Sequence, residues 1–205
     1  MFFTEEEKVL IQEAIAEGGD IWNNDKVADI KVKIKKHYRD LYENEACCYC
    51  RRDFKDEFNM VIDIEHILPK SKYGEFMFEL GNLNISCKRC NMLIKKERHD
   101  FVVDLATIRV NYQVSAQYRF IHPNLDVYHD NLSHFNFAYN NLKLVKFTAK
   151  SKKGEYTIDY FHLKKIEINN FNNAQGIVLK TDGDFLSVNL SEQDSDALEG
   201  LLKNL

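Results

Sequence analysis

The chain has 205 residues, of which 44% are hydrophobic and 29% charged, with a formal net charge of −4 at pH 7. This length suits one or two domains, and the charge is not that of a strongly basic nucleic-acid binder. No apolar run approaches the ~18–20 residues that span a bilayer, and no secretory signal is evident, so we expect a cytoplasmic protein without a membrane segment.

The first 45 residues are predicted to form a helical segment. Residues 4–17 fit an amphipathic helix, with Thr4 and Glu7 as a capping box and Gly18-Gly19 at its end. Residues 25–44 fit a second helix, capped by Asn24 or Asp25. Its basic side is either a solvated face or a surface that follows phosphates, and it carries Lys31, Lys33, Lys35, Lys36 and Arg39.

Two Cys-x-x-Cys pairs stand in the middle of the chain. They are Cys47 with Cys50 and Cys87 with Cys90. Four thiolates in two such pairs predict one structural Zn²⁺ in a tetrahedral site, whereas the alternative is a set of buried free thiols. Cys48 lies outside this spacing and is predicted to be a packing residue.

The segment between the pairs predicts two strands, and a helix follows. Residues 60–68 alternate early between apolar and polar types, and Pro69 ends the strand because proline cannot donate to a sheet. Residues 82–86 fit a second short strand and residues 87–98 a helix. Glu65 and His66 are adjacent at the end of the first strand, so their side chains meet only if the backbone bends. The fold class is therefore predicted as α+β.

This stretch resembles the HNH endonuclease family, the zinc-bearing branch of the ββα-metal nucleases. The resemblance rests on the two cysteine pairs, the Glu65-His66-Ile67 segment before Pro69, and the Gly81-Asn82-Leu83 and Cys90-Asn91 segments. It implies that His66 is the general base, that Glu65 and Asn91 hold a catalytic divalent ion, and that Asn82 orients the loop and the base. The family more often has Asp at the position of Glu65, and Glu is one methylene longer.

Simpler interpretations of these residues also exist. A histidine after a glutamate is usually a surface or satisfied core residue, Asn82 after Gly81 fits an ordinary turn, and Asn91 fits an ordinary helix position. The order of these residues between the cysteine pairs favours the family interpretation. The resemblance then implies a DNA endonuclease with structural Zn²⁺ and catalytic Mg²⁺ or Mn²⁺. The alternative is a catalytically silent zinc module that binds nucleic acid or a partner protein.

Beyond residue 98 the prediction is coarser. Residues 132–139 and 142–149 fit a strand pair, residues 151–154 a turn, and residues 157–175 and 191–205 helices. Residues 122–158 are loosely similar to the tails of HNH proteins that occur with ATPases in bacterial anti-phage systems such as Septu. That resemblance implies an ABC-type or SMC-like ATPase partner, docked by residues 99–175. The expected organisation is a helical segment (1–45), a nuclease domain (46–98) and a mixed C-terminal α+β region (99–205).

Overall fold

The structure is a computed structural model, and it describes residues 2–41, 45–139 and 142–169. The chain divides into two compact units, one formed by residues 1–134 and 147–166 and the other by residues 135–146 and 167–205. In the described part of the chain, no helix is long and apolar enough to cross a membrane. The predicted helix over residues 191–205 lies outside the described residues.

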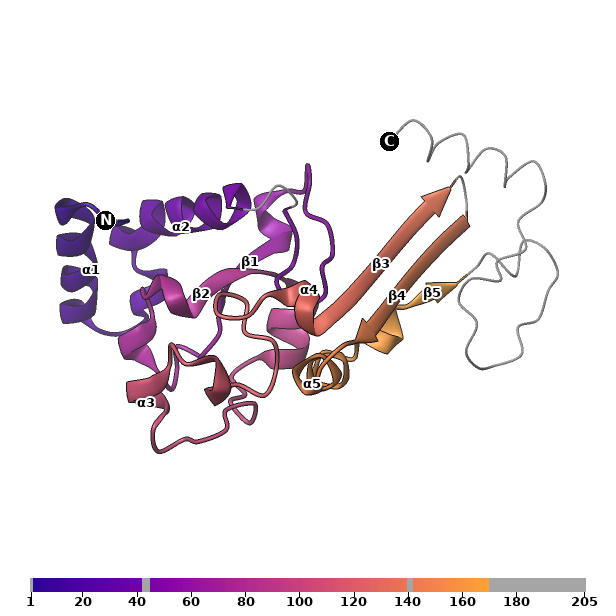
Figure 1. The fold of residues 1–205 in the computed structure, drawn as a ribbon. Coiled ribbons are helices and arrows are strands. Elements are labelled where there is room, and N and C mark those ends of the chain that lie inside the picture. Colours follow the sequence, from indigo (N-terminus) through magenta and orange to yellow (C-terminus); the bar gives the residue numbers. More distant parts are fainter. Residues whose placement is uncertain (1, 42–44, 140–141, 170–205) are drawn as a thin grey trace, which may run out of the picture. The chain divides into compact units, whose positions relative to one another are not determined.

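The N-terminal helices form close to where the sequence predicts them (Figure 1). Helix α1 covers Glu5–Glu17, and the predicted capping box is present, because Thr4 and the Glu7 side chain bond each other's backbone amides. Two short turns, η1 (Ile21–Asn23) and η2 (Asp25–Val27), precede helix α2, which covers Ala28–Asp40. The second predicted helix is therefore shorter than expected, and it begins after a 3₁₀ turn in which Asn24 accepts from the Lys26 amide.

Two antiparallel strands and a helix form the centre of the first unit. Strand β1 covers Ile62–His66 and strand β2 covers Leu83–Cys87, paired so that Ile64 lies opposite Ile85. Helix α2 packs over this pair with the buried side chains of Ile30, Ile34 and Tyr38 (Figure 1). The segment after β2 is a π-helix, η6, over Arg89–Lys95. Its last bond joins the Lys96 amide to the Asn91 carbonyl, five residues back, at 2.7 Å.

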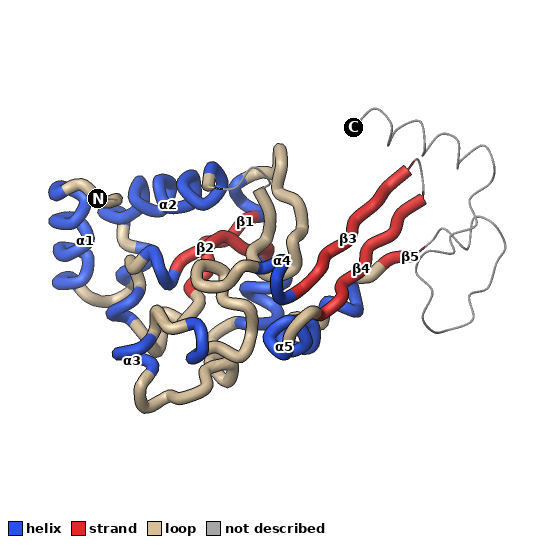
Figure 2. The backbone as a smooth tube through the Cα atoms, viewed as in Figure 1, coloured by secondary structure: helices blue, strands red, loops and turns tan. Residues whose placement is uncertain are grey.

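Loops and short helices follow η6 (Figure 2). They include α3 (Ile108–Asn111), η7 (Ser115–Gln117) and α4 (Tyr128–Asn131). Their buried aromatic side chains belong to the same core as the first cysteine pair, because the Tyr49 ring packs against Phe120 with centroids 5.6 Å apart. The residues on either side of position 98 therefore share one hydrophobic core.

The predicted strand pair is confirmed, whereas the helix predicted over residues 157–175 is wrong for residues 161–169, and residues 170–175 lie outside the described residues. Strands β3 (Leu132–Tyr139) and β4 (Leu142–Ala149) form a sheet with a third, short strand, β5 (Ile168–Asn169). Strand β5 pairs antiparallel with β4. Helix α5 covers Lys152–Tyr160, so a helix begins where the sequence predicted a turn. Ser151 caps it by accepting from the Gly154 amide. The turn η8 (Leu163–Ile166) and β5 occupy residues where the sequence predicted continued helix.

Candidate functional site

The four paired cysteines come together as one buried cluster. The sulfur atoms of Cys47, Cys50, Cys87 and Cys90 all lie within 4.8 Å of one another. The Cys50 and Cys87 sulfurs are 3.7 Å apart. A tetrahedral zinc site with Zn–S bonds of ~2.3 Å has sulfur–sulfur edges of ~3.8 Å, so this donor set fits Zn²⁺. The separation is far too long for a disulfide, whose sulfurs lie ~2.05 Å apart.

Local backbone geometry explains how the chain presents these thiols. The first pair lies in a tight turn closed by hydrogen bonds between Cys47 and residues 51 and 52, and Arg51 adopts a positive φ of 56°. Cys87 is the last residue of β2, and Cys90 lies in η6. The cluster therefore ties the turn at residues 47–50 to the end of the sheet and to the helix that follows.

Cys48 lies outside the cluster, as the spacing predicts. Its side chain is buried and its backbone amide donates to the Ile85 carbonyl at 3.1 Å, which anchors the turn on β2. Burial raises the pKa of the Cys48 thiol well above its ordinary value. A thiol in this state packs as a small hydrophobic side chain.

His66 lies at the end of β1, where the strand meets a cleft. Its Nε2 is 3.1 Å from the Met77 carbonyl oxygen, and its ring packs edge-on against Trp22 at 4.4 Å. Burial lowers the pKa of His66 to about 3, so the ring is neutral near pH 7. A carbonyl oxygen only accepts, so Nε2 carries the proton of the neutral ring and Nδ1 is left as an acceptor.

Asn82 is buried and bonded to the loop that follows His66. Its Oδ1 accepts from the Leu68 amide at 2.7 Å, and its Nδ2 donates to the carbonyls of Leu68 and Phe76, both at 3.1 Å. The same loop carries Met77, the hydrogen-bond partner of His66. These bonds fit the expected role of Asn82 in holding the loop and the imidazole.

Glu65 points away from His66 into the interior. It is fully buried, and its Oε1 accepts from the Tyr49 hydroxyl at 3.0 Å and pairs with Lys95 Nζ at 2.8 Å. Burial raises the pKa of the Glu65 carboxyl, and Lys95 opposes that shift. Glu65 does not line the cleft that contains His66 and Asn91.

Asn91 contacts a carboxylate that sequence reasoning did not single out. Its Nδ2 donates to Asp63 Oδ2 at 3.1 Å, and Lys88 pairs with Asp63 Oδ1 at 2.8 Å. Asp63 precedes Glu65 by two residues in β1, and Asp63 lines the cleft whereas Glu65 does not. That period-two spacing was the signal available in the sequence, but the resemblance directed attention to Glu65 alone.

A cleft of about 1150 Å³ contains His66 and Asn91 and has a positive lining. Eight basic and four acidic residues line it, in contrast to the net charge of −4 of the chain. The basic residues come from α2, from the loop after β1 and from the η6 region, and they are Lys31, Lys35, Lys36, Arg39, Lys70, Lys88, Lys95 and Lys96.

The oxygen donors near this cleft suit a hard divalent ion. Glu65 Oε2 is buried without a hydrogen-bond partner among the described residues, which leaves a carboxylate oxygen open to a cation. Carboxylate and amide oxygens are the ligands that Mg²⁺ and Mn²⁺ prefer. Lys95 already places one positive charge beside Glu65, so an ion held by Glu65 would share that carboxylate with the ammonium.

Comparison with known proteins agrees with this geometry. The HNH endonuclease family model matches residues 47–97. The chain is 30% identical over 162 residues to the Septu protein PtuB of Bacillus thuringiensis, in an alignment that covers 79% of this chain and 50% of the relative. The chain thus spans about half the length of that relative, and no solved structure matches. Residues 47–97, with their two strands, following helix and four-cysteine cluster, therefore form a domain of the HNH endonuclease family.

Proposed function

We propose that this protein is a metal-dependent endonuclease that hydrolyses DNA phosphodiester bonds, and that it is the nuclease of a bacterial anti-phage defence complex. One observation carries the catalytic part of the proposal: the neutral imidazole of His66 lines a cationic cleft that also contains Asn91. The similarity to a Septu protein supports the defence context.

His66 takes the proton from the attacking water in this mechanism. Its Nε2–H is held by the Met77 carbonyl, so Nδ1 accepts the proton as the water oxygen forms a bond to phosphorus and the bond between phosphorus and the 3′ oxygen breaks. Asn82 keeps the loop and ring in position through its three backbone bonds. The basic residues of the cleft balance the charge of the phosphodiester.

Glu65 and Asn91 would hold the catalytic divalent ion, which requires the Glu65 side chain to turn from the interior toward the cleft that Asn91 lines. When bound, the ion supplies charge neutralisation at the scissile phosphate and at the leaving 3′ oxygen. The open Oε2 of Glu65 supports the assignment. Asp63 keeps the Asn91 amide oriented through the bond to Oδ2.

A plasmid-nicking assay with Mg²⁺ or Mn²⁺ tests the proposal. Because loss of a general base costs about 10²–10⁴-fold, His66→Ala should lose at least about 10²-fold in rate while its zinc content and folding stay intact. His129→Ala is the matched control, since His129 is exposed on α4 and does not line the cleft. Wild-type cleavage rates in His66→Ala would refute the assignment of the base.

The same assay separates the nuclease from the silent zinc module. A chain that binds DNA but never cuts it, alone or with the proteins encoded beside it, would favour the silent module.

The assay also needs a partner, because we propose that an ABC-type or SMC-like ATPase binds the 99–175 region. The similarity to a Septu protein supports this partner, and so do exposed apolar side chains in that region: Val103, Leu105, Val110 and Val114. Strong, specific cleavage by the isolated chain would contradict a need for the partner.

A further inference from the structure

The basic residues of α2 are sorted between two faces of the helix. Lys31, Lys35, Lys36 and Arg39 line the cleft, and their spacing of four, five and eight residues from the first places them on one side. Lys33 lies outside that set and pairs with Glu7 of α1 at 2.7 Å. Helix α2 therefore uses one lysine to hold α1 and presents the other basic side chains to the cleft.

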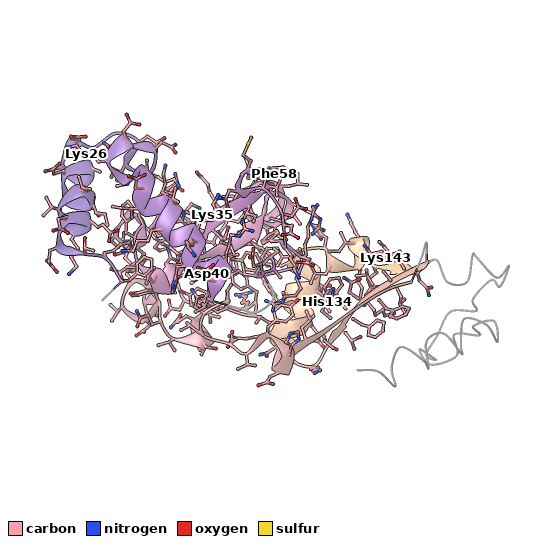
Figure 3. The ribbon with its side chains drawn as sticks, turned by 90° about the horizontal axis from the view of Figure 1, so that it is seen from above. Lys26, Lys35, Asp40, Phe58, His134 and Lys143 are labelled. Carbon is pink, nitrogen blue, oxygen red and sulfur yellow. The ribbon has the colours of Figure 1, made fainter. Side chains whose placement is uncertain are left out.

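Some of the cleft cations are engaged in holding the fold. Lys35, labelled on α2 in Figure 3, donates to the carbonyls of Asn59 and Ile62 at 2.9 and 2.7 Å, and burial lowers its pKa. Arg39 pairs with Glu45 at 2.6 Å. Lys88 and Lys95 pair with the strand carboxylates described above. These four basic residues therefore act mainly as structural ones.

The side chains of the remaining four cations make few or weak polar contacts with the described residues. The side chains of Lys31, Lys70 and Lys96 make no hydrogen bond or ion pair with any residue that the structure describes, although Lys31 lies over the Trp22 ring. Lys36 pairs with Asp40 one turn along α2, and the two side chains are 73% and 59% exposed. Exposed pairs of this kind contribute about 0–1 kcal/mol, so a phosphate competes with them easily.

We propose that Lys31 and Lys36 of α2, together with Lys70 and Lys96, bind the phosphates of a DNA duplex and direct one strand to His66. This inference rests on the proposed function, which makes DNA the ligand. Four separate cations around one cleft fit a phosphodiester backbone, which repeats its charge along the strand and is bound without regard to sequence. Together these residues form the phosphate-binding set.

Salt-dependent binding tests the set without any cleavage. Binding of a fluorescent ~25-bp duplex is measured by anisotropy on a His66→Ala background without added divalent ions, at several salt concentrations. Each lost phosphate contact lowers the slope of log K against log salt by about 0.9. For K31Q/K36Q we expect a slope lower by about 1.8 and binding on the order of 30-fold weaker near physiological salt. K70Q/K96Q should behave in the same way.

The control is K55Q/K152Q, which removes the same charge from two exposed lysines outside the cleft lining. It should keep the parental slope and affinity, and zinc content and thermal melting should be equal in all variants. Equal binding by K31Q/K36Q and by the control would overturn the proposal, as would tighter binding to an RNA duplex of the same length. If the lysine variants lose duplex affinity as expected but the wild-type chain never cuts DNA, the proposed nuclease activity is refuted and the phosphate-binding set is still supported.

Discussion

Lys95→Met tests the buried ion pair beneath the candidate site. Lys95 and Glu65 have side-chain exposures of 1% and 0%, and their charged atoms lie 2.8 Å apart. Lys95 Nζ also donates to the His66 carbonyl at 2.6 Å. Methionine keeps much of the volume of lysine and removes only the ammonium, so the substitution isolates the charge.

The expected loss of unfolding free energy is about 3–5 kcal/mol, because removing one partner leaves an uncompensated buried charge. Without Lys95, the folded-state pKa of Glu65 rises further above its unfolded value. A group of this kind contributes stability below its unfolded pKa, and that stability is lost as pH rises toward the folded pKa. The deficit relative to the wild type should therefore grow by up to about 1.4 kcal/mol per pH unit between the folded-state pKa of Glu65 in the wild type, which is already raised, and its higher folded-state pKa in Lys95→Met.

Urea unfolding of the zinc-loaded protein between about pH 6 and 8 measures this deficit. Lys96→Met is the matched control, since Lys96 is exposed and should change stability by about 0.5 kcal/mol or less. E65Q/K95M should recover much of the loss, and Mn²⁺ should recover part of it in K95M if the ion replaces the ammonium beside Glu65. A loss below about 1 kcal/mol at every pH would refute the reasoning.

Three further predictions concern individual side chains of the domain. Cys90→Ser should lose its zinc and unfold the surrounding unit, whereas Cys48→Ser should keep one zinc per chain. Metal analysis measures the zinc content and circular dichroism measures the folding. A full zinc content in Cys90→Ser would contradict the four-cysteine zinc site. Asn82→Ala removes three hydrogen bonds and should lower the free energy of unfolding by about 2–4 kcal/mol, measured by urea unfolding. It should also lower the cleavage rate on the order of 10–100-fold, measured by plasmid nicking. An unchanged free energy of unfolding would argue against the role of Asn82. Because burial holds the pKa of His66 at about 3, the imidazole stays neutral as pH falls through 6.5, so the cleavage rate should show no acidic limb there; a limb near pH 6.5 would mean that the ring is solvated.

The elements that the sequence predicted well are those specified by local chemistry. A capping box needs only Thr4 and Glu7, three residues apart, and the structure contains both of its hydrogen bonds. The first cysteine pair brings its two thiols together through a tight turn, which is also a local property. The strand pair at residues 132–149 follows from period-two alternation around two asparagines.

The errors arose where tertiary contacts decide the structure. Gly154 suggested a turn, yet it lies in α5 at a close approach of two segments: an added Cβ would lie 2.0 Å from the Asn131 carbonyl oxygen. The glycine therefore serves packing and does not break the helix. Similarly, Lys95 reads as one more surface lysine in the sequence, and only the fold shows its ammonium between Glu65 and the His66 carbonyl.

The net charge of the chain was also a poor guide to its cleft. The net charge sums all charged side chains regardless of position, whereas the fold decides which of them lie near one another. Three glutamates of α1 are paired with lysines that do not line the cleft: Lys33 of α2 pairs with Glu7, and Lys26 of η2 pairs with Glu13 and Glu17. Those pairs neutralise acidic side chains locally, and the cleft retains a twofold excess of basic over acidic residues. Since charges beyond ~8 Å are largely screened at physiological salt, a phosphate in the cleft responds mainly to this local lining and much less to the formal charge of −4.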